Sequence, residues 1–453
     1  MARSSASDPI HHVVVLMLEN QSFDRVLGCM KAVNPAIDGV DTAHPGTNAD
    51  PDGGAAYQQH PSASRTVVHD LGHDLDDVLR QMQNGCSGFI ADYATKHPNA
   101  PRAERQQVMN YFGLGDLPVF HALAQNFLVC DRWFSSVPGP TWPNRFFVHS
   151  GTSLGHVDMP EGFDPGLHIY SQPTLYERLE EKNVPWRIYF GDWPQSWLMT
   201  KQLEYFSRYS RMDRFYADAA GDPTSFPAYC FIEPSYFGAR QNDEHPPHDI
   251  WLGEALLAQV YNALRANEAL WSTTLFVVLY DEHGGFYDHV DPATADPNGQ
   301  LAVAPDTHTE RFGFNRFGIR VPALLVSPWV DAGVNHTVLD HTSLLKYATL
   351  KWGLGRLGLR TASAQTFGAA LTRRQRARTN APGPLPVPLT TIAQPTAGLN
   401  RNQNGLLAFS QFAEAHLALP PTTTVASRVQ RSFLGSAMLA QVVTERADDL
   451  ISK

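Results

Sequence analysis

Cysteine is scarce in this sequence, which has four cysteines among 453 residues. No two of them stand close enough to form a Cys-x-x-Cys motif, so a cysteine metal site is not expected. Buried free thiols are the expected state of all four, although the spacing leaves a disulfide open. The four are Cys29, Cys86, Cys130 and Cys230.

Long hydrophobic runs are also missing. No segment reaches the roughly 18 apolar residues that a membrane-spanning helix requires, and the strongest run, His12–Leu18, has the length of a strand. Residues 1–9 lead into this run without the apolar stretch and cleavage site of a signal peptide. We therefore expect a soluble protein that is cytoplasmic as written, or exported by a leaderless or removed-leader route.

Positive charge is in deficit, with 35 Lys and Arg against 45 Asp and Glu and a formal net charge of −10. Non-specific binding to nucleic acid needs clustered cations, so this class of partner is not expected. Anionic membrane surfaces are disfavoured for the same reason, which leaves at most a peripheral membrane contact. Hydrophobic residues make up 43% of the chain, enough for a large core without a sign of disorder.

The apolar segments that are present alternate between strand-like and helix-like patterns. His12–Leu18, Thr274–Tyr280 and 322–326 are nearly continuous apolar runs, as expected for strands buried on both faces of a parallel sheet. Residues 252–266 carry leucines and a valine at helical spacing behind a capping Asp249. With a second helix predicted over 343–352, this alternation favours an α/β fold.

Composition changes towards the end of the chain. Residues 381–396 contain five prolines and no charge, which indicates an extended linker. We expect three parts: a large domain over 1–380, a Pro-rich linker over 381–404, and a helical segment over 405–453. The last segment is interpreted either as a flap on the main domain or as an oligomerisation arm, and both alternatives stay open.

Polar clusters follow two of the predicted strands directly. Glu19 and Asn20 follow the first strand, and Asp281, Glu282 and His283 follow the strand that ends at residue 280. Ligands of open α/β folds lie outside the carboxyl ends of the strands. Adjacent ionisable groups after a buried strand are costly unless a metal or a substrate uses them. Together the clusters predict a site for a hard cation with oxygen ligands.

Histidine is abundant, with 19 copies. His73 follows His69 by four residues, His245 and His248 share the segment NDEHPPHD, and His341 opens the segment HTS. A single histidine is more often structural than catalytic. Several of these lie in loops rich in Pro, Gly and Asp, however, where functional sites are common.

A third pattern is the loop FSSVPGPTWPNRFFVHSGTS at residues 134–153. Prolines hold a rigid turn around Thr141, with Asn144 and Arg145 close behind. A hydroxyl in a fixed loop beside a cation site suits nucleophilic phosphoryl transfer, because metal coordination lowers the pKa of the hydroxyl.

These blocks together resemble a known family. ENQSFDRVLG at 19–28 is similar to the ENRSFDH-type motif of the phosphoesterase family, which holds bacterial and plant non-specific phospholipases C and bacterial acid phosphatases. The resemblance spans about residues 12–352. The other blocks, in the order of the family, are NGCSGF (84–89), VPGPTWPNR (137–145), NDEHPPHD (242–249), DEHGGFYDHV (281–290), RFGIRVPALLVSPWV (316–330) and DHTS (340–343).

The resemblance implies a fold and a metal site. The family is similar in fold to the alkaline phosphatase superfamily, a three-layer α/β sandwich around a mostly parallel sheet, to which this chain would add a helical C-terminal appendage. The implied ligands of one divalent ion are Glu19, Asn20, Thr141, Asp281 and Glu282. Oxygen ligands suit calcium, magnesium or manganese, and the nearby histidines keep zinc or iron open.

The resemblance also implies catalytic roles. The hydroxyl is serine in the acid phosphatases and threonine in the plant phospholipases, so Thr141 would be the nucleophile that forms a phosphothreonine. His73 and His245 would face the phosphate and protonate the departing alcohol. His248, His283 and Asn144 complete the implied catalytic set. Trp142 stands where glutamine is frequent in the family.

Three functions remain open on the sequence alone. The preferred one is a phospholipase C that releases diacylglycerol and a phosphorylated headgroup. An acid phosphatase acting on soluble phosphomonoesters is the alternative, and a different use of the fold, such as sulfate or phosphonate ester hydrolysis, is the third. Aromatic residues near the blocks either line a pocket for the substrate or belong to the core; they are Trp142, Phe146, Phe147, Phe286 and Tyr287. The sequence does not indicate an oligomeric state.

Overall fold

The computed structural model describes most of the chain. The residues described are 8–160, 170–305, 311–371, 382–390, 398–416 and 436–452. Parts of the predicted linker and of the predicted helical segment therefore lie outside the described residues.

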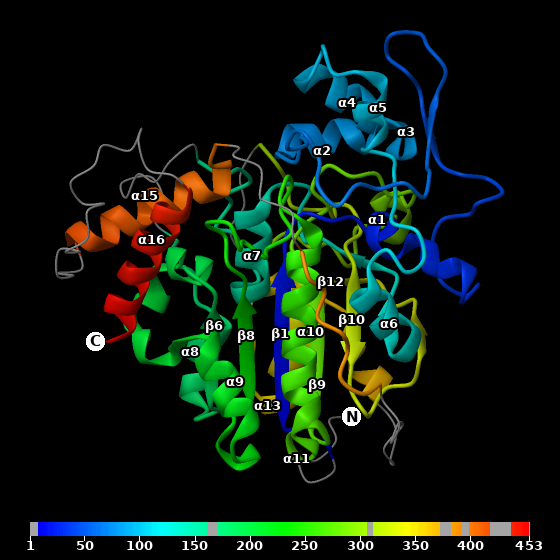
Figure 1. The fold of residues 1–453 in the computed structure, drawn as a ribbon. Coiled ribbons are helices and arrows are strands. Elements are labelled where there is room, and N and C mark those ends of the chain that lie inside the picture. Colours follow the sequence, from blue (N-terminus) through cyan, green and yellow to red (C-terminus); the bar gives the residue numbers. More distant parts are fainter. Residues whose placement is uncertain are drawn as a thin grey trace.

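An eight-stranded, mostly parallel sheet forms the centre of the molecule (Figure 1). Its strand order is β11-β4-β10-β9-β1-β8-β6-β7. The strand predicted at 322–326 is present one residue shorter, and it runs antiparallel to both of its neighbours. The strands are β1 (His12–Leu18), β4 (Leu128–Cys130), β6 (Trp186–Phe190), β7 (Tyr209–Arg211), β8 (Tyr229–Glu233), β9 (Thr274–Tyr280), β10 (Ala323–Val326) and β11 (Gly333–Asn335).

The two central strands, β1 and β9, place the site. They are parallel neighbours in which Leu18 lies opposite Tyr280, and every residue of both is buried. Because side chains cover both faces, the strands are apolar throughout rather than alternating. The shared register also makes Glu19 and Asp281 leave the sheet at the same level.

Helices cover both faces of this sheet, which gives the predicted three layers. The 17-residue α10 crosses one face, and Figure 1 shows it in front of β1 and β9, with α13 behind them. The Asp249 side chain accepts a hydrogen bond from the Trp251 amide and so caps α10, as predicted. The first layer comprises α6 (Pro118–Asn126), α9 (Met212–Ala220), α10 (Ile250–Ala266) and α11 (Glu268–Trp271), and the second α7 (Thr141–Ser150), α8 (Leu175–Glu181), α13 (His341–Trp352) and α14 (Gly358–Ser363).

A group of short helices stands above the carboxyl ends of the central strands (Figure 1). Their own apolar cluster includes Val78, Phe89, Ile90 and Met109 and reaches Phe286 in the loop after β9. This group therefore forms one wall around the end of the sheet. It consists of α2 (Leu75–Gln81), α3 (Gln83–Cys86), α4 (Phe89–Lys96) and α5 (Arg102–Gln106).

Smaller elements connect the layers. They are the helices α1 (Phe23–Leu27) and α12 (Pro292–Ala295), the strand pairs β2 (Thr47–Asn48) with β3 (Tyr57–Gln58) and β5 (Trp133–Phe134) with β12 (Leu339–Asp340), and the 3₁₀ turns η2 (Gly28–Ala32), η3 (Gln195–Leu198), η4 (Thr200–Glu204), η5 (Phe206–Arg208), η6 (Pro223–Ser225) and η7 (Phe367–Leu371).

The C-terminal part packs on the main body. The Tyr261 hydroxyl donates to the carbonyl of Pro382 over 2.7 Å, and the Asn262 amide donates to that of Leu385 over 2.8 Å, so residues 382–390 lie along α10. Two helices follow, α15 (Arg401–His416) and α16 (Ser436–Ile451). Helix α15 begins four residues before the start predicted for the helical segment.

The structure bears on the few cysteines and on the lack of long apolar runs. All four cysteines are buried and free, as expected. In the part of the chain that the structure describes, no helix has both the length and the apolar character needed to cross a membrane.

Candidate active site

The acidic and amide side chains after β1 and β9 lie together at the end of the sheet. Glu19, Asn20, Asp281 and Glu282 are all fully buried. The backbone N–H of Asn20 donates to Asp281 Oδ1 over 3.1 Å, and that of Gln21 donates to the carbonyl of Glu282 over 3.1 Å. The two loops are thus joined by hydrogen bonds, and the four predicted ligands form one group.

Thr141 lies at the first position of α7, behind Pro140 at the N-cap. Its side chain is fully buried. The N-terminus of this ten-residue helix carries unpaired amide groups and the positive end of the helix dipole, which favour a phosphate group there. The local sequence explains the geometry, because proline preceding the helix fixes the entry of the chain.

Asn144 holds this loop in shape. Its Oδ1 accepts from the Val137 amide over 3.1 Å, and its Nδ2 donates to the carbonyls of Gly139 at 2.9 Å and Pro140 at 3.2 Å. Both ends of the amide are therefore bonded to the backbone that carries Thr141. The contacts describe a residue that shapes the loop of the predicted nucleophile.

Arg145 lies in the PNR motif, but its role in the site could not be predicted from the sequence. Its Nε lies 3.1 Å from Asp281 Oδ2, and its Nη2 lies 3.3 Å from Glu19 Oε1. Burial acts to lower the pKa of Arg145, but nearby acidic groups outweigh burial and raise it above its ordinary value. Arg145 is therefore a permanent cation between two of the predicted ligands.

Several polar atoms of the five predicted ligands have no hydrogen-bond partner among the described residues. They include Oδ1 and Nδ2 of Asn20, Oγ1 of Thr141 and Oε1 of Glu282. Unpaired buried polar atoms are costly, so a cluster of them needs an explanation. The unpaired oxygens are ligand types that hard divalent cations prefer, and the residues therefore fit a metal ion.

The acidity of the carboxylates agrees with this fit. Burial raises the pKa of Glu19 to about 8, with Arg145 opposing the rise and Asp281 adding to it. Burial and then the charge of Asp281 raise the pKa of Glu282 well above its ordinary value. The protein's own cations thus do not fully balance these carboxylates, whereas a bound divalent ion would favour their ionised forms.

On the open side of this group, Asp70, His73 and His245 form a second cluster. Each offers one ligand atom, and these atoms lie within 4.8 Å of one another. Nδ1 of His73 lies 2.8 Å from the carbonyl of Leu71, and Nδ1 of His245 lies 2.6 Å from that of Pro246. A carbonyl oxygen only accepts hydrogen bonds, so both Nδ1 atoms carry a proton. The Nε2 atom of each ring is then available to bind a proton or a ligand.

His245 has the charge environment of a proton donor. Burial acts to lower its pKa, but Asp70, Glu19 and Asp243 together raise it above its ordinary value. His248, whose ring centroid lies 5.9 Å from that of His245, holds Asp243 through Nδ1 at 2.6 Å. The structure thus brings His245, His248 and His73 into one histidine group beside the carboxylates.

Two further histidines have structural contacts. His283 lies between Glu282, 3.3 Å from its Nδ1, and Gln81 Oε1, 2.7 Å from its Nε2. Burial and then the charge of His73 lower the pKa of His283 to about 3, so it is neutral. His341 donates through Nε2 to the carbonyl of Asp281 over 2.6 Å.

Two contacts of Glu19 had no signal in the sequence. Nε2 of Gln195, in the turn η3, donates to Glu19 Oε1 over 2.6 Å. Nδ2 of Asn402, in α15, lies 3.2 and 3.3 Å from the two carboxylate oxygens of Glu19. Both residues lie outside the motif blocks, so only the folded chain identifies them.

The aromatic residues near the motifs belong to the core. Trp142, Phe146, Phe147 and Phe286 are at most 2% exposed, and Tyr287 is 7% exposed. The core interpretation is therefore the correct one of the two alternatives, and these rings do not line an open headgroup pocket.

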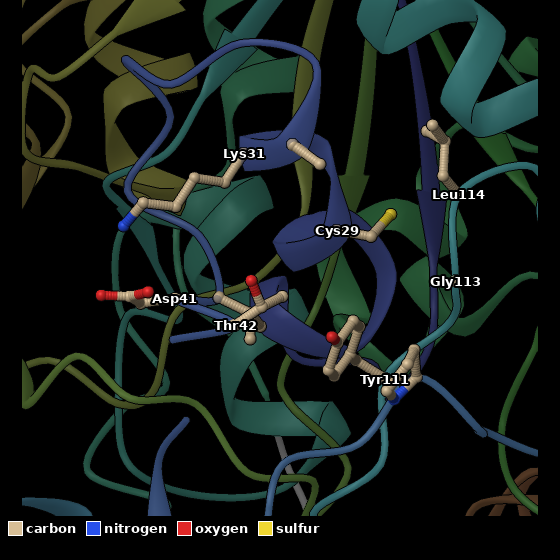
Figure 2. A pocket seen from close by; sticks show the side chains of 10 residues that line it. Cys29, Lys31, Asp41, Thr42, Tyr111, Gly113 and Leu114 are labelled. Atoms are coloured by element: carbon tan, nitrogen blue, oxygen red, sulfur yellow. The ribbon is translucent and has the colours of Figure 1, made fainter. Parts of the chain in front are cut away.

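Two surface depressions are separate from the carboxylate group. A cavity of about 310 Å³ lies beside η2, and Figure 2 shows Lys31 and Asp41 on one side of it and Tyr111 and Leu114 on the other. None of the predicted site residues lines this cavity. A second, mostly apolar groove of about 360 Å³ adjoins the loop that carries His73 and is lined in part by Val67, Val68, Leu71, Tyr93 and Val108.

Comparisons with known proteins agree with the motif blocks. A profile described as "Phosphoesterase family" matches residues 10–355. Non-specific phospholipase C3 of Arabidopsis thaliana is 36% identical over 73% of this chain and 65% of its own length. Non-specific phospholipase C4 of the same plant is 35% identical over 89% of this chain and 80% of its own length.

A bacterial relative and two solved structures extend the comparison. Phospholipase C B of Mycobacterium tuberculosis is 30% identical over 76% of this chain and 74% of its own length. A Vibrio parahaemolyticus protein of the alkaline phosphatase superfamily matches with a TM-score of 0.33 at 10% identity, over 56% of this chain and 63% of that one. A phosphonate monoester hydrolase of Agrobacterium radiobacter matches with a TM-score of 0.36 at 11% identity, over 80% and 77%. The family match over residues 10–355 and the phospholipase C relatives confirm the family resemblance inferred from the motifs.

Proposed function

Because the chain belongs to the Phosphoesterase family, we propose that it is a metal-dependent phospholipase C that cleaves phosphatidylcholine-like diesters through a phosphothreonine. The observation that carries this proposal is a buried threonine hydroxyl at the N-terminus of α7, the helix whose Arg145 contacts Glu19 and Asp281 of the carboxylate group. The names of the plant and bacterial relatives support the same activity.

The metal site would consist of the predicted set. Glu19, Asn20, Asp281, Glu282 and the hydroxyl of Thr141 would hold one divalent ion. When bound, the ion would lower the pKa of the threonine hydroxyl and neutralise charge on the phosphate. Calcium, magnesium and manganese suit the oxygen set, and zinc remains an alternative because histidines lie close.

Catalysis would proceed in two displacements. Thr141, deprotonated at Oγ1, attacks phosphorus, the bond from phosphorus to the diacylglycerol oxygen breaks, and protonated His245 gives its proton to that oxygen. Protonated His73 donates from Nε2 to a non-bridging phosphate oxygen. Water then attacks the phosphothreonine, neutral His245 takes its proton, and the bond from phosphorus to Thr141 Oγ1 breaks. The phosphorylated headgroup is released, and Thr141 and His245 return to their starting protonation states. Arg145, in contact with both carboxylates, holds Glu19 and Asp281 in place through both steps.

The apolar groove of Val67, Val68 and Leu71 favours a lipid substrate over a small soluble ester. The carbonyl of Leu71 accepts the Nδ1 proton of His73, so the groove wall and the histidine share one loop. Val68 is 69% exposed and lies on this loop, where an acyl chain would cover it. The acid phosphatase alternative has no use for such a surface.

The test combines one variant pair with two substrates. Thr141→Ala should abolish release from a chromogenic phosphocholine diester, whereas Thr141→Ser, which keeps a hydroxyl, should retain measurable turnover. Acid quenching of the wild type should give a phosphopeptide within residues 134–153, absent from Thr141→Ala. Cleavage of a phosphomonoester without cleavage of the diester would decide for the acid phosphatase. Phosphate on Ser135, Ser136 or Ser150 would show a different nucleophile.

A further inference from the structure

Asn402, in the first turn of α15, is buried in the predicted metal site. Its Nδ2 lies 3.2 and 3.3 Å from the two carboxylate oxygens of Glu19. Its Oδ1 accepts a hydrogen bond from Nε1 of Trp142 over 2.8 Å. Since the indole N–H can only donate and an ionised carboxylate can only accept, the chemistry of the two partners fixes the orientation of the amide.

The two partners belong to the two halves of the proposed site. Glu19 is a predicted metal ligand, and Trp142 follows the predicted nucleophile Thr141 directly in the chain. One amide group therefore joins the carboxylate loop after β1 to the nucleophile loop before α7. The amide carries no charge, so it orients Glu19 without cancelling the negative charge that a cation requires.

The first turn of α15 is held on the site by contacts on other sides. Arg401 Nη1 lies 2.6 Å from Asp74 Oδ1 beside α2, and the Gln403 side chain donates to the carbonyl of Tyr236. Gly405 lies against the indole of Trp142, where an added Cβ atom would lie 2.5 Å from a ring carbon. These three contacts define the position of α15 on the site.

We propose that Asn402 is a positioning residue of the metal site: it orients Glu19 for the divalent ion and holds the nucleophile loop through Trp142. This inference rests on the proposed function, because the ion and the nucleophile are those of the proposed reaction. It assigns a role in the site to a residue beyond the family match, which ends at residue 355.

The physical reason is the orientation of a metal ligand by a neighbouring group. Asn402 Nδ2 lies within hydrogen-bond distance of both carboxylate oxygens of Glu19 and so restricts the orientations that this side chain can adopt. Groups that orient metal ligands in this way commonly contribute tenfold to hundredfold to metal affinity or activity. Loss of Asn402 should therefore weaken binding of the ion and slow formation of the phosphothreonine, while binding of the lipid is retained.

The test is a calorimetric titration of the full-length protein with Mn²⁺ or Ca²⁺ alone. Asn402→Ala should weaken binding of the ion by roughly tenfold or more and lower kcat with little change in KM. Asn404→Ala is the matched control, because Asn404 is exposed on the same turn and donates to the carbonyl of Leu399. The control should match the wild type in both measurements.

A second variant separates the effect on Glu19 from the effect on the packing of α15. Asn402→Asp keeps an acceptor for the Trp142 N–H, and so preserves the contact that seats α15, but it removes the donor to Glu19. It should lower kcat as Asn402→Ala does. This variant also serves if Asn402→Ala does not fold. Wild-type kcat in Asn402→Asp, or wild-type affinity for the ion in Asn402→Ala, would overturn the proposal.

The inference and the proposed function can fail separately. Wild-type affinity in Asn402→Ala, together with a phosphopeptide in the wild-type enzyme, would refute the positioning role alone. Weakened metal binding in Asn402→Ala without diester cleavage by the wild type would refute the substrate alone. A wild-type protein that binds neither ion would overturn the positioning role and the metal site together.

Discussion

Two groups of acidic residues follow the same two strands, and their partners differ. The first is the predicted metal site, with Asp281 among its members. The second lies a few residues further along both loops and consists of Asp24, Asp288 and His289, together with Arg320 from the segment before β10. Asp24, Asp288 and Arg320 are buried and His289 is partly buried, and Asp24, Asp288 and His289 also lie close enough together to hold a metal.

The second group is internally complete. Arg320 Nε lies 2.8 Å from Asp288 Oδ1, and its Nη2 lies 3.1 Å from Asp24 Oδ1. Gln59 donates to Asp24 Oδ2 over 2.7 Å, and the His289 ring lies 2.8 Å from the same oxygen. In the first group, oxygens of Asn20, Thr141 and Glu282 lack such partners among the described residues.

The comparison shows that burial and residue type alone do not distinguish a structural cluster from a functional one. What distinguishes them is whether the protein supplies all the hydrogen bonds and charges that the cluster requires. The complete group staples the loop after β1 to the loop after β9. We expect the incomplete group, whose two loops the complete group joins, to bind the proposed ion.

The largest effect is expected in the incomplete group. Asp281→Asn keeps the size of the side chain and removes one charged oxygen ligand, so turnover should fall on the order of 10³-fold or more. The bound metal should also be lost. Elemental analysis and a diester assay measure both. Full metal content in this variant would remove Asp281 from the site.

The reverse result is expected in the complete group. Asp288→Asn leaves the buried Arg320 with one charged partner fewer, which should lower the free energy of unfolding by about 3–5 kcal/mol. Metal content per folded molecule should remain that of the wild type. Urea unfolding and elemental analysis give the two quantities. Loss of metal without loss of stability would exchange the roles of the two groups.

A pH titration sharpens the contrast. Burial acts to lower the pKa of His289, but Asp24 and Asp38 outweigh burial and raise it to about 10. Because the folded pKa lies above the unfolded value, the stabilisation is complete below about pH 6.5 and is lost as the pH rises through about 10. His289→Gln should therefore differ most from the wild type at acidic pH and least near pH 10. Melting temperatures of both proteins from pH 6 to 10 test this, and a constant difference would contradict it.

The smallest effect concerns the hydrogen bond between Trp142 and Asn402, which joins the threonine loop to α15. Trp142→Phe keeps an aromatic ring in the core and removes one hydrogen bond to Asn402, a loss of about 1 kcal/mol. We expect roughly a fivefold lower kcat, with the metal retained. If Asn402→Ala and Trp142→Phe act through the same contact, their effects on kcat should be less than additive in the double variant. Full additivity would show that the two residues act independently.

The sequence was sufficient to predict the central strands of the fold and the residues that follow them. The runs at β1 and β9 are apolar because both faces are buried, and the polar residues directly after them had to lie at the end of a parallel sheet. Local pattern thus located Glu19 and Asp281. The antiparallel direction of β10 could not be predicted, because an apolar run of four residues carries no information on direction.

The remainder of the site depends on distant packing. Gln195 and Asn402 reach Glu19 across 176 and 383 residues of sequence. Neither lies in a motif, and an isolated amide residue gives no pattern to interpret. Arg145 lies inside a motif, but its role required its distances to two carboxylates. The metal set and the histidine roles of the sequence analysis remain predictions that the variants above test.

The distance in sequence between Glu19 and Asn402 has a consequence for how the enzyme is made. The ribosome adds roughly 5–20 residues each second, so about 20–75 seconds separate the synthesis of the two partners. The strands of the central sheet and the threonine loop are synthesised before Asn402, so Glu19 lacks its amide partner throughout that interval. We therefore expect the site to reach its final geometry only after α15 has docked.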